Sequence, residues 1–180
     1  MDNTAADLQF LKARYTRAQN KYKPARIRVL LLAEAPPCSL ERYFYFEDVP
    51  TQDSLFLEIM GVLYPDGKKR YLASGRDAEL KEELLQTFKE DGYWLMDVSE
   101  IPTSLTKESL QSFIPDLLGR LQKHIERSTP IILIKASVYD ACYEALKAEG
   151  YNVSRERLPF PGSGQQKVFR EKFSQVLDTL

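Results

Sequence analysis

The sequence predicts an α/β protein, a three-layer α/β/α sandwich with a four-stranded, mainly parallel sheet. Four short strand-like runs occur along the chain, and segments with helical periodicity separate them. The first run, Val29–Ala33, is apolar at every position, which is typical of a strand buried on both faces. Because parallel neighbours need long crossover connections, helices between the strands favour a parallel sheet covered on both sides.

The predicted strands are short and end near polar or chain-breaking residues. In order, they are residues 28–33, 93–98, 131–135 and 153–158. We expect the first and third of these to be the inner strands. The fourth is the most polar, which suits an edge.

The predicted helices carry apolar residues at helical spacing and have caps or breakers at their ends. In order, they are residues 5–22, 49–64, 77–90, 107–127, 137–149 and 166–180. Thr51 or Asp53 lies near the start of the second helix, and Pro115 interrupts the fourth. Ser137 is the expected cap of the fifth, and residues 65–67 (Pro-Asp-Gly) are an expected turn.

Length and charge bound the function without deciding it. The 180 residues fit one domain, 1–180, and the net charge of −1 neither favours nor excludes nucleic acid. Basic residues gather in 8–33 and 155–172, and acidic residues gather in 77–91. A basic side that meets phosphate is therefore one interpretation, and a mixed solvated surface is the other.

Cysteine and histidine are scarce. Cys38 and Cys142 are too few and too far apart for a zinc or iron–sulfur site, so we expect no metal, no cluster and no cofactor. His124 falls in a helical pattern and is expected to be half-exposed. The chain shows no signal peptide and no apolar run of transmembrane length, which predicts free thiols, a cytoplasmic location and no membrane partner. A monomer is the default expectation.

Carboxylates follow two of the predicted strands. Glu34 ends the first strand before a stiff Ala-Pro-Pro turn, and Asp97 lies near the end of the second. The loops 34–46, 97–105 and 158–165 would all open at one edge of a parallel sheet, where ligands usually bind. The alternative is an ordinary buried strand followed by a proline turn and aromatic core residues.

Two short motifs resemble those of the uracil-DNA glycosylase superfamily. They are AEAPP at residues 33–37 and LPFPGSGQQ at residues 158–166. Members of that superfamily carry a Gly-(Gln/Glu)-(Asp/Ala/Asn)-Pro turn after the first strand and a (His/Met/Asn)-Pro-Ser-(Pro/Ser/Gly) loop after the last. The resemblance implies an α/β/α fold with a four-stranded parallel sheet, DNA as the partner, and a pocket that receives a flipped base.

The first motif carries most of the implied chemistry. Glu34 matches the Gln/Glu that frames the family's pocket, and Pro36 matches its proline. Ala35 stands where several branches have an acidic or amide residue, so Glu41 is the nearest carboxylate that could replace it. Downstream, Phe44 or Phe46 resembles the phenylalanine that stacks on the base. Asp97 stands where the family often has a base-reading Asn.

The second motif departs further from the family. Leu158 replaces the His that would stabilise the leaving base. The glycine-rich loop implies phosphate contacts from Gly162, Ser163 and Gly164, and Gln165 or Gln166 would fill the gap left by the base. Further contacts to DNA are implied for Lys167 and Arg170. The alternative is a turn sequence that would suit any protein.

Three functions remain open from the sequence. The first is a DNA glycosylase-like protein that binds a flipped or damaged base and hydrolyses its N-glycosidic bond. The second is a non-catalytic nucleic-acid-binding module on the same fold, kept for damaged or single-stranded DNA, which Leu158 and Ala35 favour. The third is an enzyme that acts on a nucleoside-like small molecule.

Overall fold

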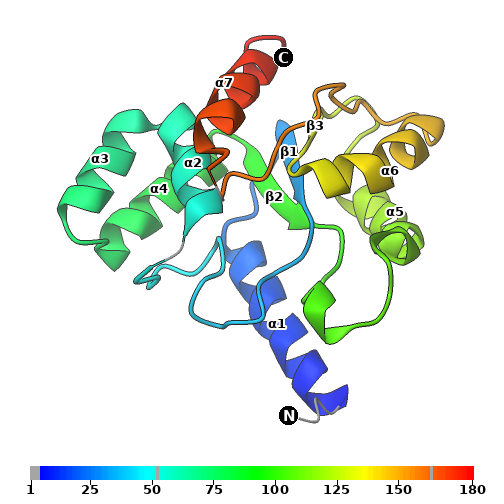
Figure 1. Ribbon diagram of the computed structural model, residues 1–180, viewed down its shortest axis with the longest axis horizontal. Coiled ribbons are helices and arrows are strands. Elements are labelled where there is room, and N and C mark those ends of the chain that lie inside the picture. Colours follow the sequence, from blue (N-terminus) through cyan, green and yellow to red (C-terminus); the bar gives the residue numbers. More distant parts are fainter. Residues whose placement is uncertain (1–4, 52, 163) are drawn as a thin grey trace.

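A three-stranded, all-parallel sheet lies at the centre of the computed structural model (Figure 1). The structure describes residues 5–51, 53–162 and 164–180, and for residues 5 and 6 it describes the backbone alone. The strand order is β2-β1-β3. The strands are β1 (Val29–Ala33), β2 (Tyr93–Asp97) and β3 (Ile131–Leu133). The predicted α/β class and parallel arrangement are confirmed.

The central strand β1 is buried along its whole length, as its uniformly apolar sequence predicts. Its register with β2 aligns Ala33 with Asp97. Two backbone bonds continue this pairing beyond the strands, from Val98 N–H to the Ala33 carbonyl (2.9 Å) and from Ser99 N–H to the Glu34 carbonyl (3.0 Å). Glu34 and Asp97 are therefore held at the same edge of the sheet.

The predicted fourth strand is reduced to one residue pair within the described part of the chain. Val153 forms a single parallel bridge with Ile131, flanked by hydrogen bonds of 2.8 Å on each side. Beyond it, Arg157 pairs with Asp140 and does not continue a ladder. The charged side chains of this segment pair with α6 and α7, and no further bridge to β3 forms among the described residues. The prediction of a strand over 153–158 was wrong in its extent.

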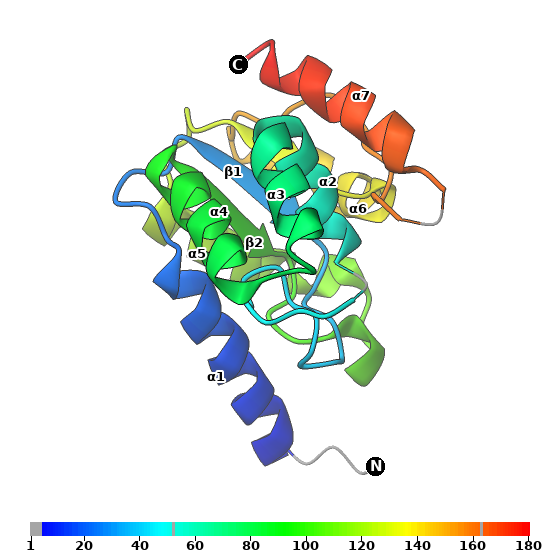
Figure 2. The ribbon, with the colours of Figure 1, turned by 90° about the vertical axis from the view of Figure 1, so that its left-hand side faces the viewer.

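The described residues form seven α-helices and two short 3₁₀-helices. The α-helices are α1 (Ala5–Lys21), α2 (Ser54–Leu63), α3 (Pro65–Ala73), α4 (Ala78–Glu90), α5 (Ile114–His124), α6 (Ala136–Ala148) and α7 (Gln166–Leu177); the 3₁₀-helices are η1 (Thr103–Leu105) and η2 (Leu110–Phe113). Figure 1 shows α2, α3, α4 and α7 on one side of the sheet and α5 and α6 on the other. In Figure 2, α1 extends away from the other layers.

Two local predictions fail for identifiable reasons. Pro65 opens α3, so residues 65–67 are a helix start and not a turn. A side chain on Gly67 would meet Leu84 Cδ2 at 2.5 Å, which shows how closely α3 packs on α4 at that point. Ser137 lies inside α6, whose N-cap is Lys135. Its hydroxyl donates a hydrogen bond to Glu34 and does not cap the helix.

Among the helices formed by the described residues, none combines the length and apolar character that a membrane span requires.

Candidate functional site

Two adjoining cavities open at the carboxyl edge of the sheet. The Asp97 cavity has a volume of about 430 Å³, and the Glu34 cavity has a volume of about 290 Å³. Each is named after the carboxylate that lines it. Residues that line both are Ala35, Pro37, Arg42, Leu55 and Phe160. The two carboxylates therefore serve one continuous hollow, formed by the loops that the sequence predicted to converge.

Glu34 is half-buried and held by two donors from the start of α6. Its Oε2 lies 2.5 Å from Lys135 Nζ and accepts a hydrogen bond of 2.6 Å from Ser137 Oγ. Burial opposes the charge, but the hydrogen bonds from Lys135 and Ser137 and the charge of Lys135 outweigh it, so the pKa of Glu34 lies below its usual value. Glu34 is consequently a fixed, ionised carboxylate at neutral pH.

Lys135 adopts an unusual backbone conformation to reach Glu34. Its φ is 90°, a region that residues with a side chain rarely occupy. Such strain persists only where the surroundings impose it, and it is concentrated at functional sites. The ammonium also lies 5.8 Å from the centre of the Phe160 ring. Lys135 therefore connects the carboxylate to the aromatic residue at the cavity mouth.

Asp97 is 6% exposed and lines the Asp97 cavity at the end of β2. Burial raises the pKa of its carboxyl to about 7, against the opposing effects of the Arg120 charge and the Tyr43 hydrogen bond. Tyr43 Oη donates to Asp97 Oδ2 at 3.4 Å. The turn that follows does not use the carboxylate, because Ile101 N–H donates to Ser99 Oγ (3.3 Å). Near neutral pH, both protonation states of Asp97 are populated.

Aromatic side chains form the walls of the Asp97 cavity. Phe44 is almost fully buried, in edge contact with Phe56. At the mouth, Phe160 is 43% exposed. Its ring lies over Gly162, where an added Cβ would meet Phe160 Cε1 at 2.8 Å. The cavity thus has a rigid inner wall and an exposed outer aromatic ring, and Gly162 leaves the space that the ring occupies.

A buried acid–base pair supports the same cavity from behind. Asp53 lines the cavity, and its Oδ2 is 2.7 Å from Nζ of the fully buried Lys81. Burial raises the pKa of Asp53 and lowers that of Lys81, while each charge stabilises the other. Asp53 is the N-cap residue of α2, in line with the sequence prediction, but its side chain pairs with Lys81 of α4 and makes no cap hydrogen bond.

The structure brings together six of the predicted site residues. The residues that line the two cavities are Glu34, Ala35, Pro36, Phe44, Asp97 and Gly162. Three others lie elsewhere. Glu41 is exposed and lines neither cavity. Phe46 stacks on Tyr15 of α1 at 5.9 Å, and Leu158 is fully buried in the core.

The predicted DNA-binding residues at the start of α7 already have partners. Lys167 is 3.8 Å from Glu171, and Arg170 pairs with Glu58 of α2. Gly164, with a φ of 83°, and Gln165, the N-cap of α7, are exposed and line neither cavity. Ser163, for which the sequence predicted a phosphate contact, lies outside the described residues. The contacts of this segment with DNA stay predictions.

Sequence reasoning missed two residues that shape the site, Lys135 and Ser137, whereas Phe160 falls in the loop 158–165 that the sequence predicted to open at this edge. Lys135 follows the third strand just as Glu34 follows the first, so the strand-end rule that selected Glu34 and Asp97 also applies to it. Its pairing with Glu34 has no local sequence signal, because it depends on the neighbouring position of β1 and β3.

The described residues include no group of three or more His, Cys, Asp or Glu side chains placed to hold a metal ion. Both cysteines are free thiols. The exposed Cys38, whose Sγ lies 2.5 Å from Ser104 Oγ, lines the Glu34 cavity, while Cys142 is buried in α6. Burial raises the pKa of the Cys142 thiol to about 12, so it stays protonated at neutral pH.

Comparisons of the chain with protein-family models, with curated proteins and with solved structures found no match.

Proposed function

We propose that the Asp97 cavity receives a flipped or damaged base of DNA, and that the chain is a divergent glycosylase-like protein related to the uracil-DNA glycosylase superfamily. One observation carries this proposal: a buried carboxyl, Asp97, lies in a cavity of about 430 Å³ beside a second carboxylate, Glu34. In this proposal the parallel bridge at Val153 is the remnant of the family's fourth strand, and the helical layers form its three-layer sandwich.

The cavity suits a base in size and in chemistry. A planar ring needs flat apolar walls and a few fixed polar groups that read its edge. Phe44 and Phe160 supply aromatic surface, and Asp97 supplies an edge reader. Stacking on an aromatic side chain contributes about 1–3 kcal/mol per base. An extruded base would thereby regain part of the stacking free energy that it loses on leaving the duplex.

Hydrolysis would divide the work between the two carboxyls. Water oxygen would bond to C1′ of the sugar as the bond from C1′ to the base nitrogen breaks, and a proton from water would end on the base. Protonated Asp97 would donate to a carbonyl oxygen of the leaving base and stabilise its developing negative charge. Ionised Glu34 would stabilise positive charge at the sugar and orient the water.

The pairing of Glu34 with Lys135 favours a second candidate, a non-catalytic DNA-binding module. An ion-paired carboxylate with a lowered pKa is a weak base, so it abstracts a proton from water poorly. Position 158 also favours this candidate. Leu158 stands where the family's His would stabilise the leaving base, and its side chain is buried in the core. In this candidate the cavity would bind a base without releasing it.

A panel of oligonucleotides, each with one altered base, tests both candidates. We expect one base to be released, with Glu34→Gln slowing release at least about tenfold through the lost charge. Glu41→Gln is the matched control, because Glu41 lines neither cavity, and it should leave the rate unchanged. Binding to DNA without base release from any substrate would select the module.

The salt dependence of binding separates both candidates from a small-molecule enzyme. Binding to DNA should weaken steeply as salt concentration rises, since phosphate contacts release counterions. Should the protein bind no oligonucleotide in the panel at low salt, the assignment of a DNA base to this cavity would be wrong.

The protonation state of Asp97 determines which base edge it reads. The protonated carboxyl donates and suits a carbonyl such as O4 of uracil, whereas the carboxylate only accepts and suits an amine such as N4 of cytosine. With a pKa of about 7, preference for a carbonyl-bearing base should fall as pH rises through 7. Asp97→Asn can donate at any pH, so it should retain that preference in alkaline buffer.

A further inference from the structure

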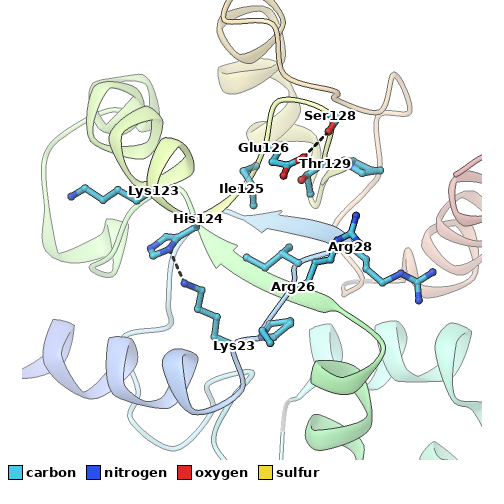
Figure 3. Close-up of a pocket in the computed structure, with 13 residues that line it drawn as sticks. Lys23, Arg26, Arg28, Lys123, His124, Ile125, Glu126, Ser128 and Thr129 are labelled. Atoms are coloured by element: carbon cyan, nitrogen blue, oxygen red, sulfur yellow. Dashed lines mark hydrogen bonds between the residues drawn. The ribbon is translucent and has the colours of Figure 1, made fainter.

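A large cavity lies at the amino edge of the sheet, opposite the candidate base pocket. Its volume is about 820 Å³. Two loops form it: residues 23–28, which lead from α1 into β1, and residues 123–130, which lead from α5 into β3 (Figure 3). The proposed glycosylase-like activity does not use this cavity.

The lining of this cavity is strongly positive. Cations that line it are Lys23, Arg26, Arg28 and Lys123, and Glu126 is the carboxylate that lines it. Among the described residues, no carboxylate lies within 4.0 Å of these four cations. Arg127 in the same loop differs, because it is 3.9 Å from Glu149. In the described part of the chain, direct ion pairs therefore do not neutralise the positive charges of these four side chains.

Two of the cations are held in place by apolar and aromatic contacts. The aliphatic stem of Arg28 lies against Gly92, where an added Cβ would come within 2.6 Å of Arg28 Cγ. Lys23 donates from Nζ to His124 Nδ1 at 2.8 Å and lies 5.3 Å from the centre of the Trp94 ring. A cation that is already positioned loses less side-chain entropy when an anion binds.

His124 shows the effect of the surrounding charge. Burial lowers the pKa of its imidazole, and the positive charges of Lys23, Lys123 and Arg120 lower it further. The groups that face it are Lys23 from the loop before β1, Lys123 and Arg120 from α5, and the ring of Trp94 from β2 at 5.2 Å. An anion in the cavity would offset these charges.

We propose that this amino-edge cavity binds a compact polyanion with the chemistry of pyrophosphate, either inorganic pyrophosphate or the diphosphate of a nucleotide. Arg26 and Arg28 present guanidinium groups, which suit phosphate oxygens, and Lys23 adds a third charge. Lys23, Arg26 and Arg28 line one hollow, whereas a row of nucleic-acid phosphates requires charges along a line. The volume is within the range of small-molecule sites.

The chain contains one tryptophan and one histidine: His124 lines this cavity, and the buried ring of Trp94 packs against His124 at 5.2 Å. Trp94 fluorescence and the His124 NMR signal therefore report binding without a label. Titration with pyrophosphate at constant ionic strength should change both signals saturably, with a Kd below about 1 mM. Bound anion favours imidazolium, so the pKa of His124 should rise, and affinity should increase as pH falls.

A pair of double variants tests whether pyrophosphate binding depends on the cavity or only on the overall charge of the protein. R26Q/R28Q should weaken pyrophosphate binding by roughly tenfold or more, because two charge-assisted contacts are lost. R17Q/K107Q removes the same charge from exposed positions that do not line the cavity, and it should change the Kd less than about twofold. Equal weakening by both pairs would overturn the proposal, as would the absence of saturable binding.

Two further ligands identify the source of the phosphate. Tighter binding of ADP than of pyrophosphate would assign the site to a nucleotide, and the reverse order would assign it to the inorganic anion. Tighter binding of a single-stranded oligonucleotide than of either, weakened by R26Q/R28Q alone, would replace the compact anion by a nucleic-acid backbone. Chromatographic and circular-dichroism checks that the variants are folded make a loss of binding interpretable.

Discussion

The two edges of the sheet differ in the burial and pairing of their charged side chains. At the carboxyl edge the charged groups are wholly or partly buried and paired, as in Glu34 with Lys135 and Asp53 with Lys81. At the amino edge Arg26 and Arg28 are exposed and have no carboxylate partner among the described residues. Burial shifts pKa values and fixes geometry, which suits base reading and bond cleavage, whereas exposed charge attracts anions through its field.

The largest difference between the edges should appear in stability. Lys81→Met leaves Asp53 buried without a partner, and breaking a buried pair costs about 3–5 kcal/mol of unfolding free energy. Lys123→Met, the matched change at the amino edge, should alter the unfolding free energy by less than about 0.5 kcal/mol. Urea denaturation of the two variants measures both.

A double variant checks the reason for the Lys81 effect. If the cost comes from the orphaned Asp53, then K81M/D53L should recover most of the lost stability, because apolar residues can replace a buried pair. A double variant less stable than K81M would show that the two side chains support the fold separately.

The second prediction concerns the pH dependence of stability at the carboxyl edge. The pKa of Asp97 is raised from 3.8 to about 7, so the folded state binds a proton more tightly than the unfolded state does. Between these two pH values the unfolding free energy should fall as pH rises, by roughly 4 kcal/mol at most. Asp97→Asn should remove this slope.

Thermal unfolding across pH 4–8 measures the effect of Asp97→Asn, with Glu41→Gln as the exposed-carboxylate control. The control should keep the slope of the parent protein. A slope unchanged in Asp97→Asn would show that another group titrates in this range and that Asp97 is ionised throughout.

The backbone arrangement was largely predictable, because β1 and the helical patterns depend on local sequence. The predicted fourth strand was not, since whether residues 153–158 pair depends on their neighbours in space. Its charged residues find ion pairs with α6 and α7 in place of a ladder. A polar run is compatible with an edge strand and with a loop, and sequence alone cannot separate them.

For the candidate site, the sequence identified Glu34 and Asp97 but not the groups that set their ionisation. The carboxylates follow strands, which is a local signal, and the register then aligns them. Lys135 and Ser137 are about a hundred residues away in the chain, and Ser137 had a simpler local interpretation as a helix cap. The sequence did not distinguish Phe44 from Phe46. The packing of Phe46 against Tyr15 of α1 is what separates it from the cavities.

The third prediction tests the support of the amino-edge cavity. Gly92 has a φ of 83°, and an added Cβ would meet Arg28 Cβ, Cγ and Cδ within 2.9 Å. Gly150 has a φ of 79° and no atom near an added Cβ. Gly150→Ala should therefore cost about 1–2 kcal/mol, from backbone strain alone. Gly92→Ala should cost about 1 kcal/mol more because of overpacking.

Pyrophosphate binding provides a second readout for the glycine pair. Displacement of Arg28 in Gly92→Ala should weaken binding at the amino edge, whereas Gly150→Ala should not. Equal stability costs for both variants would indicate that Arg28 moves aside freely and is not positioned by Gly92.

The smallest expected effect, and the most specific to the carboxyl edge, concerns the backbone of Lys135. Lys135→Ala loses the pair with Glu34, worth about 0–1 kcal/mol at this exposure, and retains the φ of 90°. Lys135→Gly loses the same pair but relieves about 1–2 kcal/mol of backbone strain. Glycine also gives the unfolded chain more conformational freedom, which destabilises the folded state by about 0.4–1 kcal/mol. The glycine variant should therefore be the more stable of the two, by about 0.5–1 kcal/mol.

The sign of this difference is what makes it informative. At Glu144, an exposed position inside the regular part of α6, glycine should be less stable than alanine by about 1 kcal/mol. The opposite order at Lys135 would measure the strain that holds its ammonium against Glu34. Both Lys135 variants should also raise the pKa of Glu34, measured by carboxyl NMR, because the positive charge that stabilises its carboxylate is gone. If glycine is the less stable at both positions, the backbone at Lys135 is not strained. The ammonium would then reach Glu34 at no conformational cost, and only the charge of Lys135 would matter to the site.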